Sequence, residues 1–470
     1  MNSHFYHRLH SFSNILKIVI FFIIISNLKM NAEINESLMA ENYSAIADKI
    51  IKSAHSDTTA YHRLEYMCDV FGPRLSGSEN LEKSLLWMLD EMKKDGFANV
   101  RADEVMVPHW VRRYEKCEMI HPRIANVPVF AFGGSIGTPK GGITAPVIVV
   151  ESFDELESIK DEIKGKIVVY NFPYEGYGKN FPFRYYGAIR AAKYGAVASL
   201  MRPLSNNVSN NVHTGVMIYD DTIPKIPHAS ITPEDAMMFS RLIKYGITPQ
   251  LKLELDLEML PDAVSHNVIG ELTGTQYPDE IIAIGGHSDS WDAGTGAHDN
   301  AGGCIVTWEA VRLLKNLGLK PKRTIRIVQW TNEENGVRGG NYYRDAHKDE
   351  NHVLMFEHDS GIFTPSAIRF TGSDTILNAI KFMEPLLKKI TPEIKVTNGG
   401  GGVDIKPMME TGIPGMSLGT NDGGKYFHYH HSHTDTPDKV SPKDLNDCIA
   451  AIAIAIYIYA DLPTELINKK

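Results

Sequence analysis

The stretch "IIAIGGHSDSWDAGTGAHDNAGG" (Ile281 to Gly303) joins two sharply different sequence patterns. Its first four residues are typical of a strand inside a sheet. The rest is a glycine-rich loop that carries two histidines and three aspartates. Acids and imidazoles beside a hydrophobic core are costly unless a partner satisfies them. The stretch therefore predicts a buried strand that leads directly into a functional site.

The region around this stretch has the pattern of an α/β protein. From Ser265 onward, apolar segments such as "NVIGEL", "RTIRIVQWT" and "HVLMFEHD" alternate with helical segments such as "GGCIVTWEAVRLLKNLG". Near-continuous apolar strands that alternate with helices indicate a sheet covered on both faces. We therefore expect an α/β fold with a largely parallel, mixed sheet flanked by helices.

The rest of the chain divides by composition. Its 470 residues suggest two or three domains. Residues 33–127 begin with a helical pattern, whereas residues 128–258 contain short β-like runs between glycine- and proline-rich turns. We expect residues 33–127 and 259–470 to form the two parts of one catalytic domain. Residues 128–258 would then be an inserted, mainly β domain.

Residues 1–32 have the order of a secretory signal peptide, with a basic and polar start, an apolar run and small residues at the end. The run Ile18 to Ile25 is too short to span a bilayer, which needs ~20 apolar residues. Glycosylation sequons at Asn35, Asn42 and Asn207 agree with secretion. We expect a secreted glycoprotein that has no membrane attachment after cleavage. The lysosome or another secretory-pathway compartment is the alternative destination.

Charge and cysteine content exclude several classes of protein. The formal net charge of −9 gives no reason to expect nucleic acid or an anionic membrane as a partner. Four cysteines are too few for a disulfide scaffold in a chain of this length, and Cys304 is expected to be a buried free thiol. The apolar segment "CIAAIAIAIYIYA" (Cys448 to Ala460) is short for a membrane span and predicts a buried helix.

Three predicted strands end in the same kind of polar residue. The strand "IIAIGG" precedes His287 and Asp289, and "TIRIVQWT" precedes Glu333 and Glu334. The strand "HVLMF" is followed by Glu357, His358 and Asp359. In an open parallel sheet, ligands bind beyond the carboxyl ends of the strands. These side chains are therefore expected to meet in one crevice.

Crowded carboxylates need a cation, because mutual repulsion would otherwise raise their pKa values. A mixed set of histidines and acids suits zinc, whereas calcium prefers more oxygen ligands and few histidines. The segment "FHYHHSHTD" offers further imidazoles, and spacing alone leaves open which of them binds: His428, His430, His431 or His433.

The sequence resembles the dinuclear zinc exopeptidases, a family that includes bacterial aminopeptidases and glutamate carboxypeptidases. The resemblance is densest in "GGHSDSWDAGTGAHDNAGG", "RTIRIVQWTNEENG", "HDSG" and "KYFHYHHSHTDT", and it covers nearly the whole mature chain. The insert is similar to a protease-associated domain in "GKIVVYNF", "AAKYGAVASLM" and "IPHASIT".

This resemblance implies two zinc ions per chain and a role for each site residue. Asp299 would bridge both ions, and His287 and Asp359 would complete the two metal sites from opposite sides. Glu334 would bind one ion and His431 the other. His431 is chosen because the family's last ligand stands four residues before the acid of an Asp-Thr pair, here Asp435. Two further residues would act beside the metals: Asp289, which would hydrogen-bond His287 and fix its tautomer, and Glu333, the general base.

The resemblance also implies hydrolysis of small peptides, above all dipeptides with free ends, by a hydroxide that bridges the two zinc ions. The family further suggests a homodimer. Three alternatives remain open. The first two are an aminopeptidase that ignores the carboxyl end of its substrate and a glutaminyl cyclase that works with one zinc. The third is an inactive receptor-like ectodomain, which loss of the ligands or of the general base would indicate, and this chain retains them all.

Overall fold

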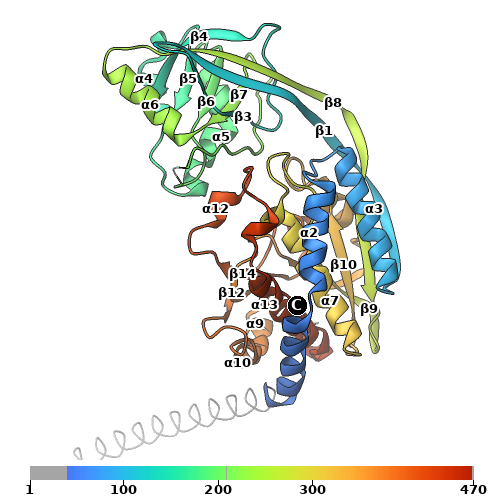
Figure 1. Ribbon diagram of the computed structural model, residues 1–470. Helices are drawn as coiled ribbons and strands as arrows, with labels where there is room; N and C mark the ends of the chain where they lie inside the picture. Colours follow the sequence, from blue (N-terminus) through green and yellow to red (C-terminus); the bar gives the residue numbers. More distant parts are fainter. Residues whose placement is uncertain (1–39, 208, 468–470) are drawn as a thin grey trace, which may run out of the picture.

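The computed structural model describes residues 40–207 and 209–467. The predicted signal peptide and Asn35 lie outside these residues. Two lobes are joined by a long antiparallel ribbon of β1 (Ala98–His121) and β8 (Gln250–Leu272) (Figure 1). Within the described part of the chain, no helix is both long and apolar enough to cross a membrane.

The large lobe is built on a mixed sheet with the strand order β13-β12-β14-β11-β9-β10-β8. The pairs β9–β10, β9–β11, β11–β14 and β12–β13 are parallel, whereas β12–β14 and β8–β10 are antiparallel. The predicted largely parallel sheet is thereby confirmed. Its remaining strands are β9 (Tyr277–His287), β10 (Arg323–Trp330), β11 (Asn351–Glu357), β12 (Thr364–Thr371), β13 (Lys395–Asn398) and β14 (Gly415–Asn421).

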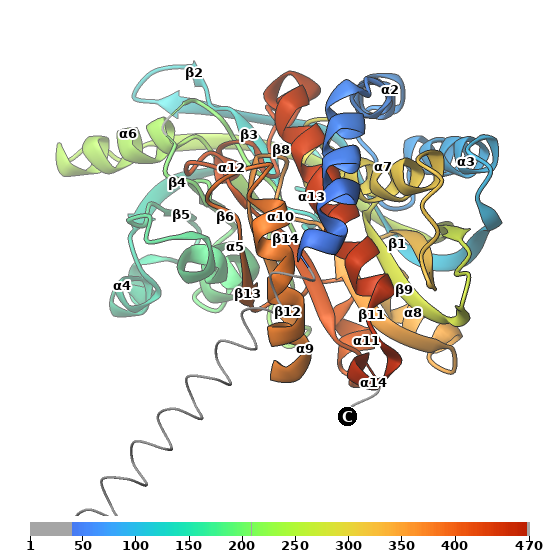
Figure 2. The same ribbon diagram turned by 90° about the horizontal axis from the view of Figure 1, so that it is seen from below.

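This sheet is buried on both faces, which explains why its strands are apolar at nearly every position. Alternate residues of a strand face opposite sides, so Ile282 and Ile284 belong to one core while Ile281 and Ala283 belong to the other. The first core is covered by a helix over residues 40–56 and by α2 (Thr59–Phe71), α3 (Glu79–Lys94), α7 (Gly302–Asn316) and α13 (Pro442–Asp461) (Figure 2).

The opposite face and the outer edge carry shorter helices. Tyr343 of α8 (Arg338–His347) and Met408 of α11 (Lys406–Met409) pack into the second core. The other short helices of this lobe are α9 (Asp374–Ile380), α10 (Glu384–Leu387), α12 (Tyr426–Tyr429) and α14 (Thr464–Ile467). Two predictions are confirmed here: α13 is buried along its apolar length, and Cys304 is a buried free thiol.

The small lobe has its own sheet, in which four parallel strands end with antiparallel β3. Three helices cover it, so it is less purely β than the sequence suggested. The 16-residue helix α5 contains Pro182 and many aromatic residues, which conceal its helical pattern. The elements are β3 (Val129–Ala131), β4 (Ile143–Val150), α4 (Phe153–Ser158), β5 (Ile167–Tyr170), α5 (Tyr177–Ala192), β6 (Ala198–Met201), β7 (His228–Ile231) and α6 (Pro233–Lys244).

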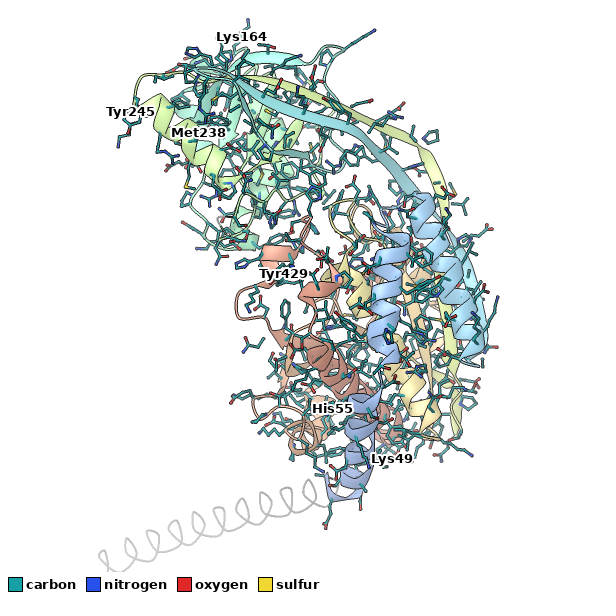
Figure 3. The ribbon with its side chains drawn as sticks, in the orientation of Figure 1. Lys49, His55, Lys164, Met238, Tyr245 and Tyr429 are labelled. Atoms are coloured by element: carbon teal, nitrogen blue, oxygen red, sulfur yellow. The ribbon has the colours of Figure 1, made fainter. Side chains whose placement is uncertain are left out.

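The two lobes face each other across the end of the large sheet. Tyr429 of α12 lies where they meet, whereas Lys164 and Tyr245 lie on the outer side of the small lobe and Lys49 at the far end of the large lobe (Figure 3). Tyr177 of α5 stacks on Phe427 of α12 with their ring centroids 4.7 Å apart. Because the lobes face each other at this end of the large sheet, the carboxyl ends of its parallel strands lie in the region between the lobes.

Candidate metal centre

The strand ends converge as the sequence predicts. His287 is the last residue of β9, Glu333 and Glu334 follow β10, and Asp359 follows β11. Both β10 and β11 lie directly beside β9 and run parallel to it. Their polar side chains therefore leave the sheet at the same edge.

Asp299 reaches this edge from a short turn (Ala297–Ala301) that directly precedes α7. The Asp435 carboxylate accepts hydrogen bonds from the backbone amides of His298 and Asp299, at 2.7 and 3.1 Å. Gly303 allows the start of α7 to come close, because a Cβ there would lie 2.1 Å from the His358 carbonyl oxygen. The loop is thus fixed with the Asp299 carboxylate at the centre of the site.

Asp299 is shared by two groups of side chains. His287 Nε2 lies 3.2 Å from Asp299 Oδ1 and 3.6 Å from Asp359 Oδ1. His431 Nε2 lies 3.2 Å from Asp299 Oδ2 and 2.9 Å from Glu334 Oε2. The structure therefore brings all five predicted ligands together, with one carboxylate between two imidazoles.

The grouping differs from the expected one. The sequence interpretation placed His287 and Asp359 at opposite metal sites and separated Glu334 from His431. The structure instead pairs His287 with Asp359 and Glu334 with His431. Strand order alone allows either grouping, because β11 lies between β9, which ends at His287, and β14, which precedes His431. The direction of the Asp359 side chain, towards His287, decides the grouping.

The donor set fits cations. Among the described residues, four buried ligand atoms have no hydrogen-bond partner: His287 Nε2, Asp299 Oδ2, Glu334 Oε1 and Asp359 Oδ1. Burial, followed by the charge of Asp299, raises the pKa of Glu334 to about 7. Burial disfavours the charged form of His287 and His431, yet neighbouring acids hold the pKa of both imidazoles well above the usual value. A cation would remove the need for these protons and satisfy the unpartnered atoms.

Glu333 is placed differently from its neighbour. Its carboxylate is 4.0 Å from His287 Nε2, and its side chain is 15% exposed, whereas that of Glu334 is 3% exposed. Burial and the charges of Asp359 and Glu334 raise the pKa of Glu333 well above its usual range. Glu333 thus lies beside the ligand cluster and is more exposed than Glu334.

Asp289 supports the site in another way than expected. Its carboxylate is 3.6 Å from His287 Nδ1, and the imidazole is instead 3.0 Å from the Asp289 backbone carbonyl oxygen. The Asp289 carboxylate accepts the backbone amides of Glu333 and Glu334, at 3.1 and 3.2 Å. The Asp289 carboxylate therefore orients both glutamates. The spacing of these residues in the sequence does not reveal these two hydrogen bonds.

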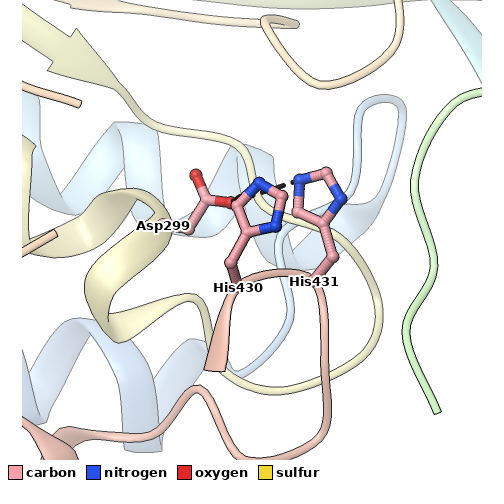
Figure 4. A group of neighbouring side chains, drawn as sticks. All are labelled: Asp299, His430 and His431. Atoms are coloured by element: carbon pink, nitrogen blue, oxygen red, sulfur yellow. Dashed lines mark ion pairs between the residues drawn. The ribbon is translucent and has the colours of Figure 1, made fainter. Parts of the chain in front are cut away.

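His430 also reaches the centre. Its Nε2 lies 3.5 Å from Asp299 Oδ2, and its ring stacks on His431 with centroids 3.6 Å apart (Figure 4). His431 contacts both Asp299 and Glu334, so its position suits a ligand better. The sequence showed His430 only as one of four candidate histidines in the segment.

The small lobe completes the surroundings. Its Thr214 amide donates to the His431 carbonyl oxygen at 2.8 Å, and Arg184 Nη1 lies 3.4 Å from His431 Nδ1. Arg112 of the ribbon forms a two-point ion pair with Asp292 of the metal loop, at 2.8 and 2.9 Å. The sequence analysis missed these residues, because no local motif marks them.

Comparisons with known proteins show which family the chain belongs to. The model of peptidase family M28 matches residues 267–456. Carboxypeptidase Q from Mus musculus is 44% identical over 439 residues, 92% of this chain and 93% of that protein. The human carboxypeptidase Q is also 44% identical, over 87% of this chain and 86% of its own length.

Solved structures extend the comparison. A peptidase M28 precursor from Shewanella amazonensis has a TM-score of 0.86 and 31% identity, and the match covers 90% of this chain and 98% of that one. A zinc aminopeptidase from Bacillus subtilis shares the fold, with a TM-score of 0.65 at 21% identity over 85% of this chain and 94% of its own.

These matches define the class of the protein: it is a metallo-exopeptidase, which is a kind of hydrolase. The chain belongs to peptidase family M28, in the branch that carboxypeptidase Q represents.

Proposed function

We propose that this protein is a zinc-dependent exopeptidase that binds two zinc ions and hydrolyses small peptides, above all dipeptides with free termini. The observation that carries the proposal is the sharing of Asp299 by two imidazoles, each with its own second carboxylate. One ion would be held by His287, Asp299 and Asp359, and the other by His431, Asp299 and Glu334. Imidazole and carboxylate together are a ligand set that zinc accepts.

The bound zinc, Glu333 and Asp289 would each have a different role in the hydrolysis. Bound zinc lowers the pKa of a coordinated water towards ~7 and polarises a peptide carbonyl. Glu333 takes a proton from the attacking water and later delivers it to the leaving amine. Its raised pKa, caused by burial and the nearby acids Asp359 and Glu334, suits a group that must both accept and release a proton. Asp289 holds Glu333 in place through the backbone amide.

The decisive experiment compares three forms of one dipeptide: Ala-Leu, its N-acetyl form and its C-terminal amide. We expect the zinc-loaded protein to cleave only the free form. Equal cleavage of the amide would replace the dipeptidase assignment with an aminopeptidase. Failure to cleave any form would return the glutaminyl cyclase and receptor-like alternatives to consideration.

The metal requirement has a separate test. Dialysis against a chelator should abolish hydrolysis of Ala-Leu, and added zinc should restore it. Metal analysis of the active protein should give two zinc ions per chain. A stoichiometry of one ion at full activity would contradict the two-metal proposal.

The proposal also covers the location and assembly of the protein: it is a secreted or lysosomal glycoprotein, and it forms a homodimer. Asn42 is exposed on the helix over residues 40–56, and Asn207 is partly exposed on the small lobe, so both are accessible for glycosylation. Digestion with an N-glycosidase should reduce the mass of protein recovered from a secreting host. Sedimentation of the purified protein should give twice the mass of the chain.

A further inference from the structure

Arg184 of helix α5 is a buried cation beside the metal centre. The residue is 3% exposed. Its Nη2 donates to the Tyr177 hydroxyl at 2.8 Å, and its Nη1 lies 3.4 Å from both the Thr214 carbonyl oxygen and His431 Nδ1. Its Nε has no hydrogen-bond partner among the residues that the structure describes. None of these contacts supplies a negative charge.

A buried charge is unusual without an opposite partner, because loss of hydration is costly. Arg112 shows the usual solution in the same molecule, since it pairs with Asp292 and Glu115. Within residues 40–207 and 209–467, Arg184 forms no ion pair, and its guanidinium lies over the rings of Tyr177 and Phe181. This difference indicates that an anion from outside the chain completes the site.

The guanidinium lines a small pocket between the lobes, whose free volume of about 10 Å³ is enough for roughly one water molecule. His430 and His431 form the side towards the metal centre, and the remaining wall is mostly apolar: Phe132, Met201, Pro203 and Leu204. A space of this size admits a single oxygen atom, such as one oxygen of a carboxylate, beside the guanidinium. Gly215 makes room for the arginine, because a Cβ there would lie 2.3 Å from Arg184 Nη1.

The position relative to the metal ligands suggests which anion binds. The two nitrogens of the His431 ring face different groups: Nε2 faces Asp299 and Glu334, and Nδ1 faces Arg184. One imidazole ring therefore separates the guanidinium from the ligand cluster. A peptide residue spans ~3.3–3.6 Å. The terminal carboxylate of a dipeptide lies about one residue beyond its scissile carbonyl, a separation that suits this gap.

We propose that Arg184 binds the carboxyl terminus of the peptide substrate, so that the small lobe measures substrate length. The inference rests on the proposed function and adds the residue that selects a free carboxylate one residue beyond the scissile bond. Arginine suits this role because its planar fork can donate two parallel hydrogen bonds to a carboxylate.

The test measures hydrolysis of Ala-Leu and its C-terminal amide by the zinc-loaded wild type and three variants: Arg184→Met, Arg184→Lys and Arg190→Met. We expect Arg184→Met to raise KM for Ala-Leu about 10- to 100-fold and to leave hydrolysis of the amide as low as in the wild type. Arg184→Lys should retain part of the preference, because it keeps the charge without the fork. Arg190 is exposed on the same helix, so Arg190→Met is the matched control and should behave like the wild type.

Inhibition by a product provides a second readout that needs no turnover. Free leucine should inhibit Arg184→Met at least 10-fold more weakly than the wild type, whereas leucinamide should inhibit both equally. Thermal unfolding of each variant shows whether the fold is intact. Equal inhibition of the wild type and of a correctly folded Arg184→Met variant by free leucine would assign Arg184 a purely structural role and overturn the inference.

The two proposals fail in different ways. A wild type that prefers the free dipeptide, with an Arg184→Met variant that keeps this preference, overturns the inference and leaves the dipeptidase function standing. A wild type that cleaves the amide equally well overturns both, because no terminal carboxylate is then recognised.

Discussion

At the scale of single residues, the Asp435 carboxylate fixes the backbone that carries the shared ligand, since it accepts the amides of His298 and Asp299. We expect Asp435→Asn to weaken zinc binding about 10- to 100-fold, because an amide side chain loses the charge and one acceptor. Competition with a chelating dye measures this affinity. Asp438→Asn, at an exposed residue three positions later, should leave it unchanged. Equal affinities for both variants would contradict the role of Asp435.

Glu333 is the residue on which the proposed proton transfers depend. We expect Glu333→Gln to lower kcat for Ala-Leu about 100- to 10,000-fold, because the amide cannot accept a proton. Zinc content should stay at the wild-type level, since the nearest predicted ligand, Glu334, is untouched. Steady-state kinetics and metal analysis of the same preparation check both statements.

A matched control for Glu333→Gln is Glu410→Gln, because Glu410 is exposed. It should retain wild-type activity. If Glu333→Gln keeps more than about a tenth of the wild-type kcat, another group must act as the base, since a general base typically contributes at least a hundredfold.

Sequence reasoning succeeded for residues whose role follows from a local motif. His287 and Glu334 stand in glycine-rich or acidic segments directly after apolar strands, so their convergence could be predicted, whereas the role of Asp299 was expected from the family resemblance. Arg184 could not, because it lies inside a helix and becomes part of the site only when the small lobe folds over His431. The contacts of Asp289 with the amides of Glu333 and Glu334 could not be predicted for a similar reason, since its carboxylate reaches the backbone of the next strand's loop as well as His287.

At the scale of elements, the start of α7 must pack closely against two neighbouring segments. A Cβ on Gly303 would lie 2.1 Å from both the His358 carbonyl oxygen and Asn300 Oδ1. We expect Gly303→Ala to destabilise the fold by about 1–3 kcal/mol or more, because it overpacks a rigid junction. Chemical denaturation measures this free energy of unfolding.

Gly178 in helix α5 is the counterpart for this substitution, because a Cβ there meets no atom within 4 Å. Gly178→Ala should be neutral or stabilise by up to about 1 kcal/mol, since alanine reduces the entropy of the unfolded chain. If both alanine variants unfold at the same denaturant concentration, a Cβ at residue 303 does not destabilise the start of α7, and the prediction is wrong.

Elements also show what the sequence left undecided. The buried strands and α13 were predictable from their apolar runs and length, and α3 from its three- and four-residue spacing of apolar residues. The order of the strands was not, and neither was the direction of the Asp359 side chain, which joins His287 rather than His431. Pairing between strands is a long-range property that no single segment records.

At the scale of the whole molecule, the two lobes contribute opposite charges to one site. The large lobe supplies the acids and most of the imidazoles, whereas the small lobe supplies a cation and an apolar wall. The β1–β8 ribbon joins the lobes, and Arg112 connects this ribbon to the metal loop through Asp292. Catalysis and substrate selection would therefore depend on both lobes.

Stability of the whole molecule should fall in acid, because each lobe contains a buried neutral histidine. Burial lowers the pKa of His228 in the small lobe and of His352 in the large lobe, in each case to about 4. The unfolded chain binds these protons from about pH 6.5 downward. Between pH 6.5 and about 4 the unfolded state thus holds more protons, so stability decreases as pH falls and is unaffected by these groups above pH 6.5.

The size of the effect follows from the shift, at roughly 2–3 kcal/mol per histidine by pH 4.5. We expect His228→Asn to be less stable than the wild type at pH 7, since His228 Nδ1 lies 2.8 Å from Ser199 Oγ. The difference between the two should narrow as pH falls, because only the wild type loses the contribution of a neutral imidazole. Thermal unfolding of both proteins between pH 7 and 4.5 measures this convergence, with His62→Asn at an exposed position as the control. A constant difference across this range would show that His228 does not couple folding to pH, whereas convergence would mean that the neutral imidazole stabilises the fold at pH 7 and loses this contribution in acid.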